Sequence, residues 1–126
     1  MGDGKPRDIG ERSLDYAVRA VRLYRTLQDM KDGAASVIGK QFLRSATSVG
    51  ANIAEAQEAE SRADFIHKYS IAQKEARESE YWLNLLEKAA IMPAKRLIPL
   101  KQETGELIGI ITTILVKTKR RVKGEG

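Results

Sequence analysis

The sequence predicts an all-α protein, an up-down antiparallel bundle of four helices. Three observations support this fold class. Apolar residues recur at intervals of three and four through most of the 126-residue chain, which is the spacing of one face of an α-helix. Helix-forming residues dominate, and Gly and Pro are sparse in the middle of the chain. The breaks between periodic segments are short, and short loops between long helices favour antiparallel neighbours.

The first helix is predicted at about residues 9–30, followed by a turn at Asp32-Gly33. Its apolar arc is wider than the roughly 100° stripe that one core requires, which indicates a second contact surface. Its main apolar face is predicted to contain Leu14, Ala17, Val18, Val21 and Tyr24. Residues that extend this face around the side are Tyr16, Ala20, Leu23 and Leu27.

The second helix is predicted at about residues 36–59, where Gly39 and Gly50 require a packing reason because Gly destabilises a helix interior by about 1 kcal/mol. Small residues at these positions allow a neighbouring backbone to approach closely. The apolar seam of this helix consists of Ile38, Phe42, Ala46, Val49, Ile53 and Ala56.

The third helix is predicted at about residues 62–90, because Ser61 and Asp64 form a helix-start signal. Its heptad seam is Phe65, Tyr69, Ala72, Ala76, Ser79, Leu83, Leu86 and Ala90. Pro99 lacks an amide hydrogen and should kink or restart a helix. The fourth helix is therefore placed at about residues 99–120, after a short turn around Pro93 to Leu97. Its seam is Leu100, Thr104, Leu107, Ile111 and Ile114, broadened by Ile108 and Leu115.

The whole chain, residues 1–126, is predicted to be a single domain with a polar N-terminus and a basic C-terminal tail. The chain has no Cys, and residues 1–10 are polar and contain no apolar core of signal-peptide length. No run is long enough to cross a membrane. We therefore expect a cytoplasmic protein.

No catalytic or metal constellation is recognisable, so we expect a non-enzymatic protein without a cofactor or metal. His67 is the sole histidine and falls on the polar side of its helix. The acidic residues Glu75, Glu78, Glu80 and Glu87 raise the alternative of a carboxylate metal site. Di-iron bundles use Glu-x-x-His pairs, which this chain lacks, and pairs such as Lys74–Glu78 are expected instead.

Two basic features suggest binding to RNA or DNA phosphates. Residues 92–126 carry eight basic and three acidic side chains, an excess equal to the net charge of +5. A second set lies on one face of the first helix, where Asp15 and Asp29 interrupt it. The alternative is a solvated face and a soluble basic tail. The candidate nucleic-acid-binding residues are Arg12, Arg19, Arg22, Arg25, Lys117, Lys119, Arg120, Arg121 and Lys123.

A polar stripe borders the seam of the second helix: Gln41, Ser45, Ser48, Asn52 and Glu55. Such groups either fix helix register through hydrogen bonds or form a ligand surface. The absence of a nucleophile–base pair favours the structural role.

The second helix also carries a resemblance, in the run from Gln41 to Ala56, QFLRSATSVGANIAEA. Together with Ala63-Asp64-Phe65-Ile66 and Tyr81-Trp82-Leu83, this run resembles the 23S rRNA intervening-sequence protein family. The resemblance covers residues 13–120. It implies a bacterial four-helix bundle that forms a ring-like homopentamer, related to the basic accessory determinant of diversity-generating retroelements, and it implies no catalysis.

The leading hypothesis is therefore an oligomeric bundle that binds RNA or DNA with little sequence selectivity. The alternative is a protein-interaction scaffold, or an accessory subunit that recruits a protein partner such as a nucleic-acid enzyme.

Overall fold

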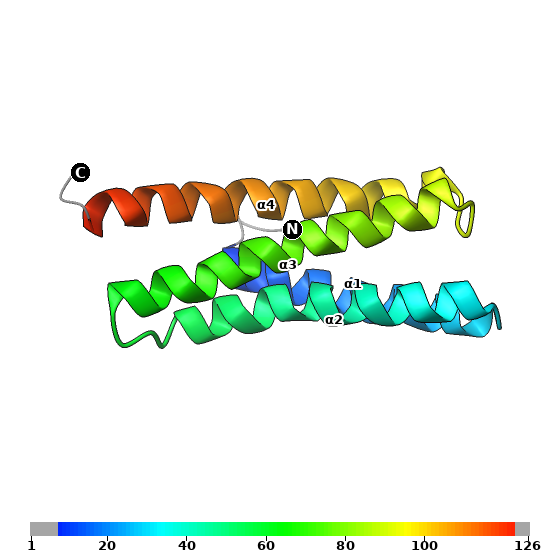
Figure 1. Cartoon of the computed structure of the whole chain (residues 1–126), viewed down its shortest axis with the longest axis horizontal. Helices are drawn as coiled ribbons and strands as arrows, with labels where there is room; N and C mark the ends of the chain where they lie inside the picture. Colours follow the sequence, from blue (N-terminus) through cyan, green and yellow to red (C-terminus); the bar gives the residue numbers. More distant parts are fainter. Residues whose placement is uncertain (1–7, 123–126) are drawn as a thin grey trace, which may run out of the picture.

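The computed structural model describes residues 8–122, which form four α-helices and contain no strand within that range. The helices are α1 (Ile9–Asp29), α2 (Gly33–Ala56), α3 (Arg62–Lys88) and α4 (Ala94–Val122). They run alternately up and down (Figure 1). Each helix packs closely on the next in sequence, whereas α1 and α4 pack together less closely. The predicted all-α, four-helix fold class is confirmed.

Side-chain caps define where the first three helices begin. Asp8 accepts a hydrogen bond from the amide of Glu11 at 2.8 Å, and Ser61 accepts one from the amide of Asp64 at 3.0 Å. Asp32 likewise accepts from the amide of Ala35 at 2.8 Å. Because Asp32 is a cap, α2 begins at Gly33, three residues before the predicted start, and it ends at Ala56.

The predicted start of the fourth helix at residue 99 is wrong, because α4 begins at Ala94 and continues through Pro99. Pro99 cannot donate to the carbonyl of Lys95. Both residues are exposed, so water can hydrate that carbonyl. Leu97 and Leu100 flank Pro99 and are buried in the core, which holds the segment in place.

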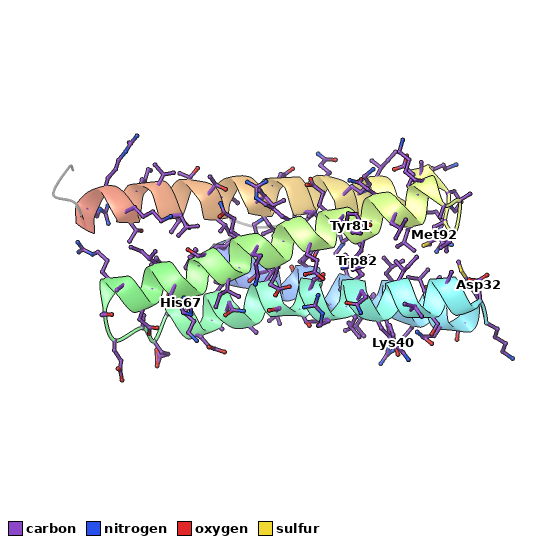
Figure 2. The ribbon with its side chains drawn as sticks, in the orientation of Figure 1. Asp32, Lys40, His67, Tyr81, Trp82 and Met92 are labelled. Carbon is purple, nitrogen blue, oxygen red and sulfur yellow. The ribbon has the colours of Figure 1, made fainter. Side chains whose placement is uncertain are left out.

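The loops α1–α2 and α3–α4 lie at the same end of the bundle, marked by Asp32 and Met92 in Figure 2. Each contains a non-glycine residue in the left-handed region, Lys31 (φ 52°) and Ala90 (φ 57°). At the end of α3, the amide of Ile91 donates to the carbonyl of Leu86 and that of Ala90 to Glu87, both at 3.0 Å. This arrangement is a Schellman motif, which usually has Gly at the left-handed position.

The core divides into two clusters along the bundle. The cluster nearer this end, which we call the four-helix half, takes buried residues from all four helices, among them Tyr16, Phe42, Leu83 and Leu107. The other cluster, the three-helix half, contains Val49, Ile53, Ala56, Tyr69, Ala72, Ala76, Ile111 and Leu115. These come from α2, α3 and α4, and α1 contributes only the partly buried Ile9.

The predicted main face of α1 is wrong. Its core-facing residues are Ser13, Tyr16, Ala20 and Leu27, whereas Leu14 is 64% exposed and Val18 42%. Tyr16 decides this orientation: its ring packs edge-on against Phe42, with centroids 6.3 Å apart. Its hydroxyl shares a 2.5 Å hydrogen bond with Thr104 Oγ1. Both apolar faces predicted for α1 therefore exist. The face predicted as the lateral extension enters the core, and the face predicted as the main one is partly exposed.

The two glycines of α2 lie where α1 crosses it closely, as predicted. A Cβ at Gly50 would meet the backbone oxygen of Ser13 at 3.2 Å, and one at Gly39 would meet the Leu27 side chain at 3.2 Å.

In α4, Leu115 is buried and Ile114 only partly so. Leu115 therefore occupies the core-facing position of the α4 seam that was predicted for Ile114.

Candidate nucleic-acid interface

The last turns of α4 form the most basic stretch of the described chain. Lys117, Lys119, Arg120 and Arg121 are all exposed, and α4 contains no acidic residue after Glu106. Lys123, the remaining candidate, lies outside the described residues. Within the described chain these four cations have no ion-pair partner, so their charge is available to an anion.

Arg12 differs from the other candidates because it is already engaged by α4. Its guanidinium donates to both carboxylate oxygens of Glu103, at 2.7 and 3.1 Å, and to Glu106 at 2.7 Å. These hydrogen bonds to Glu103 and then Glu106 raise the pKa of Arg12 above its ordinary value. Arg12 therefore links α1 to α4 and contributes little positive potential outside the bundle.

Two of the α1 arginines meet a third arginine across the α1–α4 junction. Arg19 and Arg22 line a pocket of about 220 Å³ together with Arg96 at the start of α4. The remaining lining residues are Leu23, Thr26, Met92, Leu97, Pro99 and Leu100. Arg25 is exposed but does not line this pocket. Arg96 is not identifiable from the sequence, because only the fold places it beside α1.

The two basic regions lie far apart. Arg96 and Arg120 are separated by about 36 Å along α4, at 1.5 Å per residue. Arg12 meets α4 at Glu103 and Glu106, so roughly 20 Å of α4 extends beyond the start of α1. Figure 1 shows the C-terminal turns of α4 at the end opposite the α1–α2 loop.

The polar stripe of α2 is mainly engaged within the bundle. Ser45 is buried and its hydroxyl lies 2.8 Å from that of Ser79 on α3. Asn52 donates to the carbonyl of Ser48 at 2.9 Å, and Glu55 pairs with Lys68 on α3 at 2.7 Å. Gln41 accepts a long hydrogen bond of 3.4 Å from Arg44. Ser45 and Glu55 therefore link α2 to α3, whereas the hydrogen bonds of Asn52 and Gln41 lie within α2.

The expected Lys74–Glu78 pair does not form. Instead, Glu78 is bound by Arg44 of α2 and by the indole of Trp82, whose Nε1 donates to it at 3.0 Å. Arg44 also binds Glu75 at 3.2 Å. The side chain of Tyr81 packs edge-on against Trp82, with ring centroids 4.9 Å apart (Figure 2). Arg44 comes from a different helix, so spacing within the third helix cannot predict this network.

Within residues 8–122, no group of three His, Cys, Asp or Glu side chains is arranged to hold a metal ion. His67 is exposed near the N-terminal end of α3 (Figure 2). None of the four described helices is long and apolar enough to cross a membrane.

The fold and these surfaces define a class of protein, a small four-helix bundle with two separate basic regions. The sequence matches the 23S rRNA-intervening sequence protein family over residues 8–113. The chain belongs to this family, as the resemblance implied.

A solved structure supports the same conclusion. It is a crystal structure from Bacteroides thetaiotaomicron described as a protein with unknown function from the S23 ribosomal protein family. It is 42% identical to this chain, with a TM-score of 0.81, and the match covers 86% of this chain and 98% of the other. None of the curated proteins matches the sequence.

Proposed function

We propose that the protein is a non-enzymatic, oligomeric bundle that binds RNA or DNA through backbone phosphates with little sequence selectivity. The observation that carries this proposal is the exposed cluster Lys117, Lys119, Arg120 and Arg121, which no described carboxylate neutralises. Phosphate backbones attract such a cluster regardless of sequence, and binding releases counterions.

Binding should be tested by fluorescence anisotropy with a structured RNA and a duplex DNA at 50 and 200 mM salt. We expect affinity to fall steeply between these concentrations, by at least tenfold. The triple variant Lys119→Glu, Arg120→Glu and Arg121→Glu should abolish binding. The matched control, Lys40→Glu, Lys74→Glu and Lys88→Glu, changes the net charge equally at exposed positions elsewhere. Absence of wild-type binding at micromolar protein and 50 mM salt would refute the proposal.

Self-association is the second part of the proposal, with the pentameric ring implied by the family resemblance as the expected state. Its support is the apolar side of α1 that faces away from the core, with Leu14 64% and Val18 42% exposed. A hollow of about 310 Å³ borders this side and is lined mainly by small and apolar residues, including Gly50, Ala51 and Ala54.

The oligomeric state is measurable by light scattering at tens of micromolar protein. We expect a mass several times the 14.0 kDa of one chain. Leu14→Glu should dissociate the assembly, whereas Met30→Glu, which also places a carboxylate at an exposed apolar position of the α1 region, should leave it intact. A wild-type mass of one chain would refute self-association.

A protein-interaction scaffold is the alternative, and the surface around Tyr81 favours it. Tyr81 is 59% exposed and lies against Trp82, close to the ion pairs of Arg44. Tyr, Trp and Arg are the residues most enriched in binding hot spots. A scaffold would keep its partner after the Lys119, Arg120 and Arg121 changes and would lose it in Tyr81→Ala.

A further inference from the structure

The pocket between α1 and α4 is lined by three arginines from two helices. Arg19 and Arg22 lie three residues apart on α1, and Arg96 lines the same pocket from the first turn of α4. The acidic residues of α4, Glu103 and Glu106, pair with Arg12 and not with these three arginines. Three like charges around about 220 Å³ repel one another, and an anion in the pocket relieves that repulsion.

The pairing of Arg12 with Glu103 prevents this acidic residue of α4 from neutralising the arginines of the pocket. Glu103 lines the hollow next to the pocket, together with Asp15, Arg19 and Arg22. Both carboxylate oxygens of Glu103 accept hydrogen bonds from Arg12 instead. Glu106 is held by the same guanidinium. Arg12 therefore engages both carboxylate oxygens of Glu103, the acidic residue of α4 that shares this hollow with Arg19 and Arg22.

The lining of the pocket indicates the class of ligand. Guanidinium groups match phosphate oxygens with paired N–H donors, which makes Arg the preferred residue for phosphate recognition. The other part of the lining is apolar, with Leu23, Leu97 and Leu100 beside the arginines. A sugar or base attached to the phosphate would lie against these side chains.

We propose that Arg19, Arg22 and Arg96 bind the phosphate group of a nucleotide, either free or within a nucleic-acid strand, and that Arg12 is a positioning residue that keeps the Glu103 carboxylate paired, so that it does not pair with them. Binding to a nucleic-acid strand rests on the proposed function, whereas binding to a free nucleotide does not. Lys117 and Arg121 lie on the same side of α4 as Arg96, about 32 and 38 Å away. These separations bracket the helical repeat of duplex DNA, about 34–36 Å, so a duplex along α4 would present phosphates to both regions.

The binding experiment uses adenosine 5′-monophosphate as the probe, titrated into the full-length protein and followed by NMR of the arginine Nε–Hε groups. We expect saturable shifts with a Kd on the order of 1 mM. Arg96→Gln or Arg22→Gln should weaken binding at least tenfold. Arg120→Gln removes the same charge about 36 Å away and should change the affinity by less than twofold. Circular dichroism checks that each variant is folded, as expected for exposed residues.

Two Arg12 variants test the positioning role. Arg12→Met releases Glu103 and should weaken nucleotide binding several-fold, although Arg12 does not line the pocket. Adding Glu103→Gln to Arg12→Met removes the released carboxylate and should restore the affinity. If the double variant binds no better than Arg12→Met, the positioning role is refuted.

Parallel titrations with a duplex DNA and a structured RNA separate the two sources of the phosphate. Weaker binding of either nucleic acid by Arg96→Gln would identify nucleic-acid phosphates as the ligand. Unchanged binding of both nucleic acids with lost nucleotide binding would identify a free nucleotide. Nucleotide binding by a protein that binds neither RNA nor DNA would refute the proposed function and leave the pocket assignment standing. No saturable binding at 10 mM nucleotide, or equal loss in Arg96→Gln and Arg120→Gln, would overturn the pocket assignment.

Discussion

The two halves of the bundle differ in how many helices enclose their cores. In the four-helix half, α1 covers the seam between α2 and α4, and Tyr16 places its hydroxyl against Thr104. In the three-helix half, α2, α3 and α4 supply the buried residues, and α4 extends past the start of α1. The less enclosed half also carries the basic turns at Lys117–Arg121.

This difference predicts that the four-helix half mainly stabilises the fold and that the three-helix half mainly offers surface for binding. The core side chains of both halves have almost no exposed surface, but four helices supply their neighbours in one half and three in the other. Incomplete enclosure leaves helix surface for other molecules. The following changes test whether the halves differ as described.

The largest effect is expected from shortening one buried leucine in each half. Leu83→Ala should reduce the free energy of unfolding by about 3–5 kcal/mol, because Leu83 has no exposed surface and the enclosed half cannot collapse around the cavity. Leu115→Ala should cost about 2–3 kcal/mol, because the three-helix half can relax. Urea denaturation measures both, and equal costs would remove the distinction between the halves.

Alkaline unfolding should depend mainly on Tyr16. Burial raises the pKa of Tyr16 to about 12, against an ordinary value of 10.0, and the hydrogen bond with Thr104 only partly opposes this effect. The folded protein therefore favours the neutral phenol. Its stability contribution is complete below pH 10 and is lost as the pH rises towards 12, by about 3 kcal/mol at most.

Tyr16→Phe should remove most of this pH dependence, as followed by thermal unfolding from pH 9 to 11.5. Burial also raises the pKa of Tyr69 in the three-helix half. Tyr69→Phe should remove a smaller part, because only three helices supply the buried residues around its phenol. A larger effect of Tyr69→Phe would contradict the comparison.

A gain in stability is expected at the end of α3, in the four-helix half. Ala90 has φ 57°, a conformation that costs an L-residue about 1–2 kcal/mol. Ala90→Gly should therefore stabilise the protein by about 1 kcal/mol. Ala89→Gly is the matched control, because Ala89 has φ −81° and gains nothing from Gly. Thermal denaturation distinguishes them, and equal shifts would show that φ at Ala90 is not strained.

The smallest effect concerns the surface ion pairs. In the four-helix half, Lys101 donates to Glu87 at 2.5 Å, and this hydrogen bond lowers the pKa of Glu87 below 4.5. The pair therefore stabilises the fold above about pH 4.5 and ceases to do so as the pH falls below it. Glu87→Gln should be slightly less stable than the wild type at pH 7, and this difference should shrink as the pH falls below 4.5 and Glu87 becomes protonated. A difference that does not change with pH would exclude the ion pair as its cause.

Most of the fold followed from periodicity. The seams of α2 and α3 were predicted almost residue by residue, because one face of each helix is clearly apolar. The core-facing side of α1 was not predicted correctly, because its apolar residues cover two adjacent faces and periodicity alone cannot choose between them. The start of α4 was misplaced because Pro99 acts as a helix breaker only where its neighbours cannot compensate for the missing hydrogen bond, and here Leu97 and Leu100 anchor the segment.

The candidate site was predicted less completely than the fold. The cluster at the end of α4 is contiguous in sequence, so it was visible as a run of charge. The ion pairs of Arg12 and the place of Arg96 in the pocket were not visible in the sequence. Both depend on contacts between α1 and α4, which are distant in sequence.

The sequence by itself determined the four helices, the family and the location of the excess positive charge, because helix periodicity, local motifs and charge runs are all short-range properties. Only the tertiary structure decided which apolar face of α1 enters the core, which arginine is neutralised and which three arginines share a pocket. The physical reason is that these outcomes depend on distances between side chains from different helices, and helix packing sets those distances.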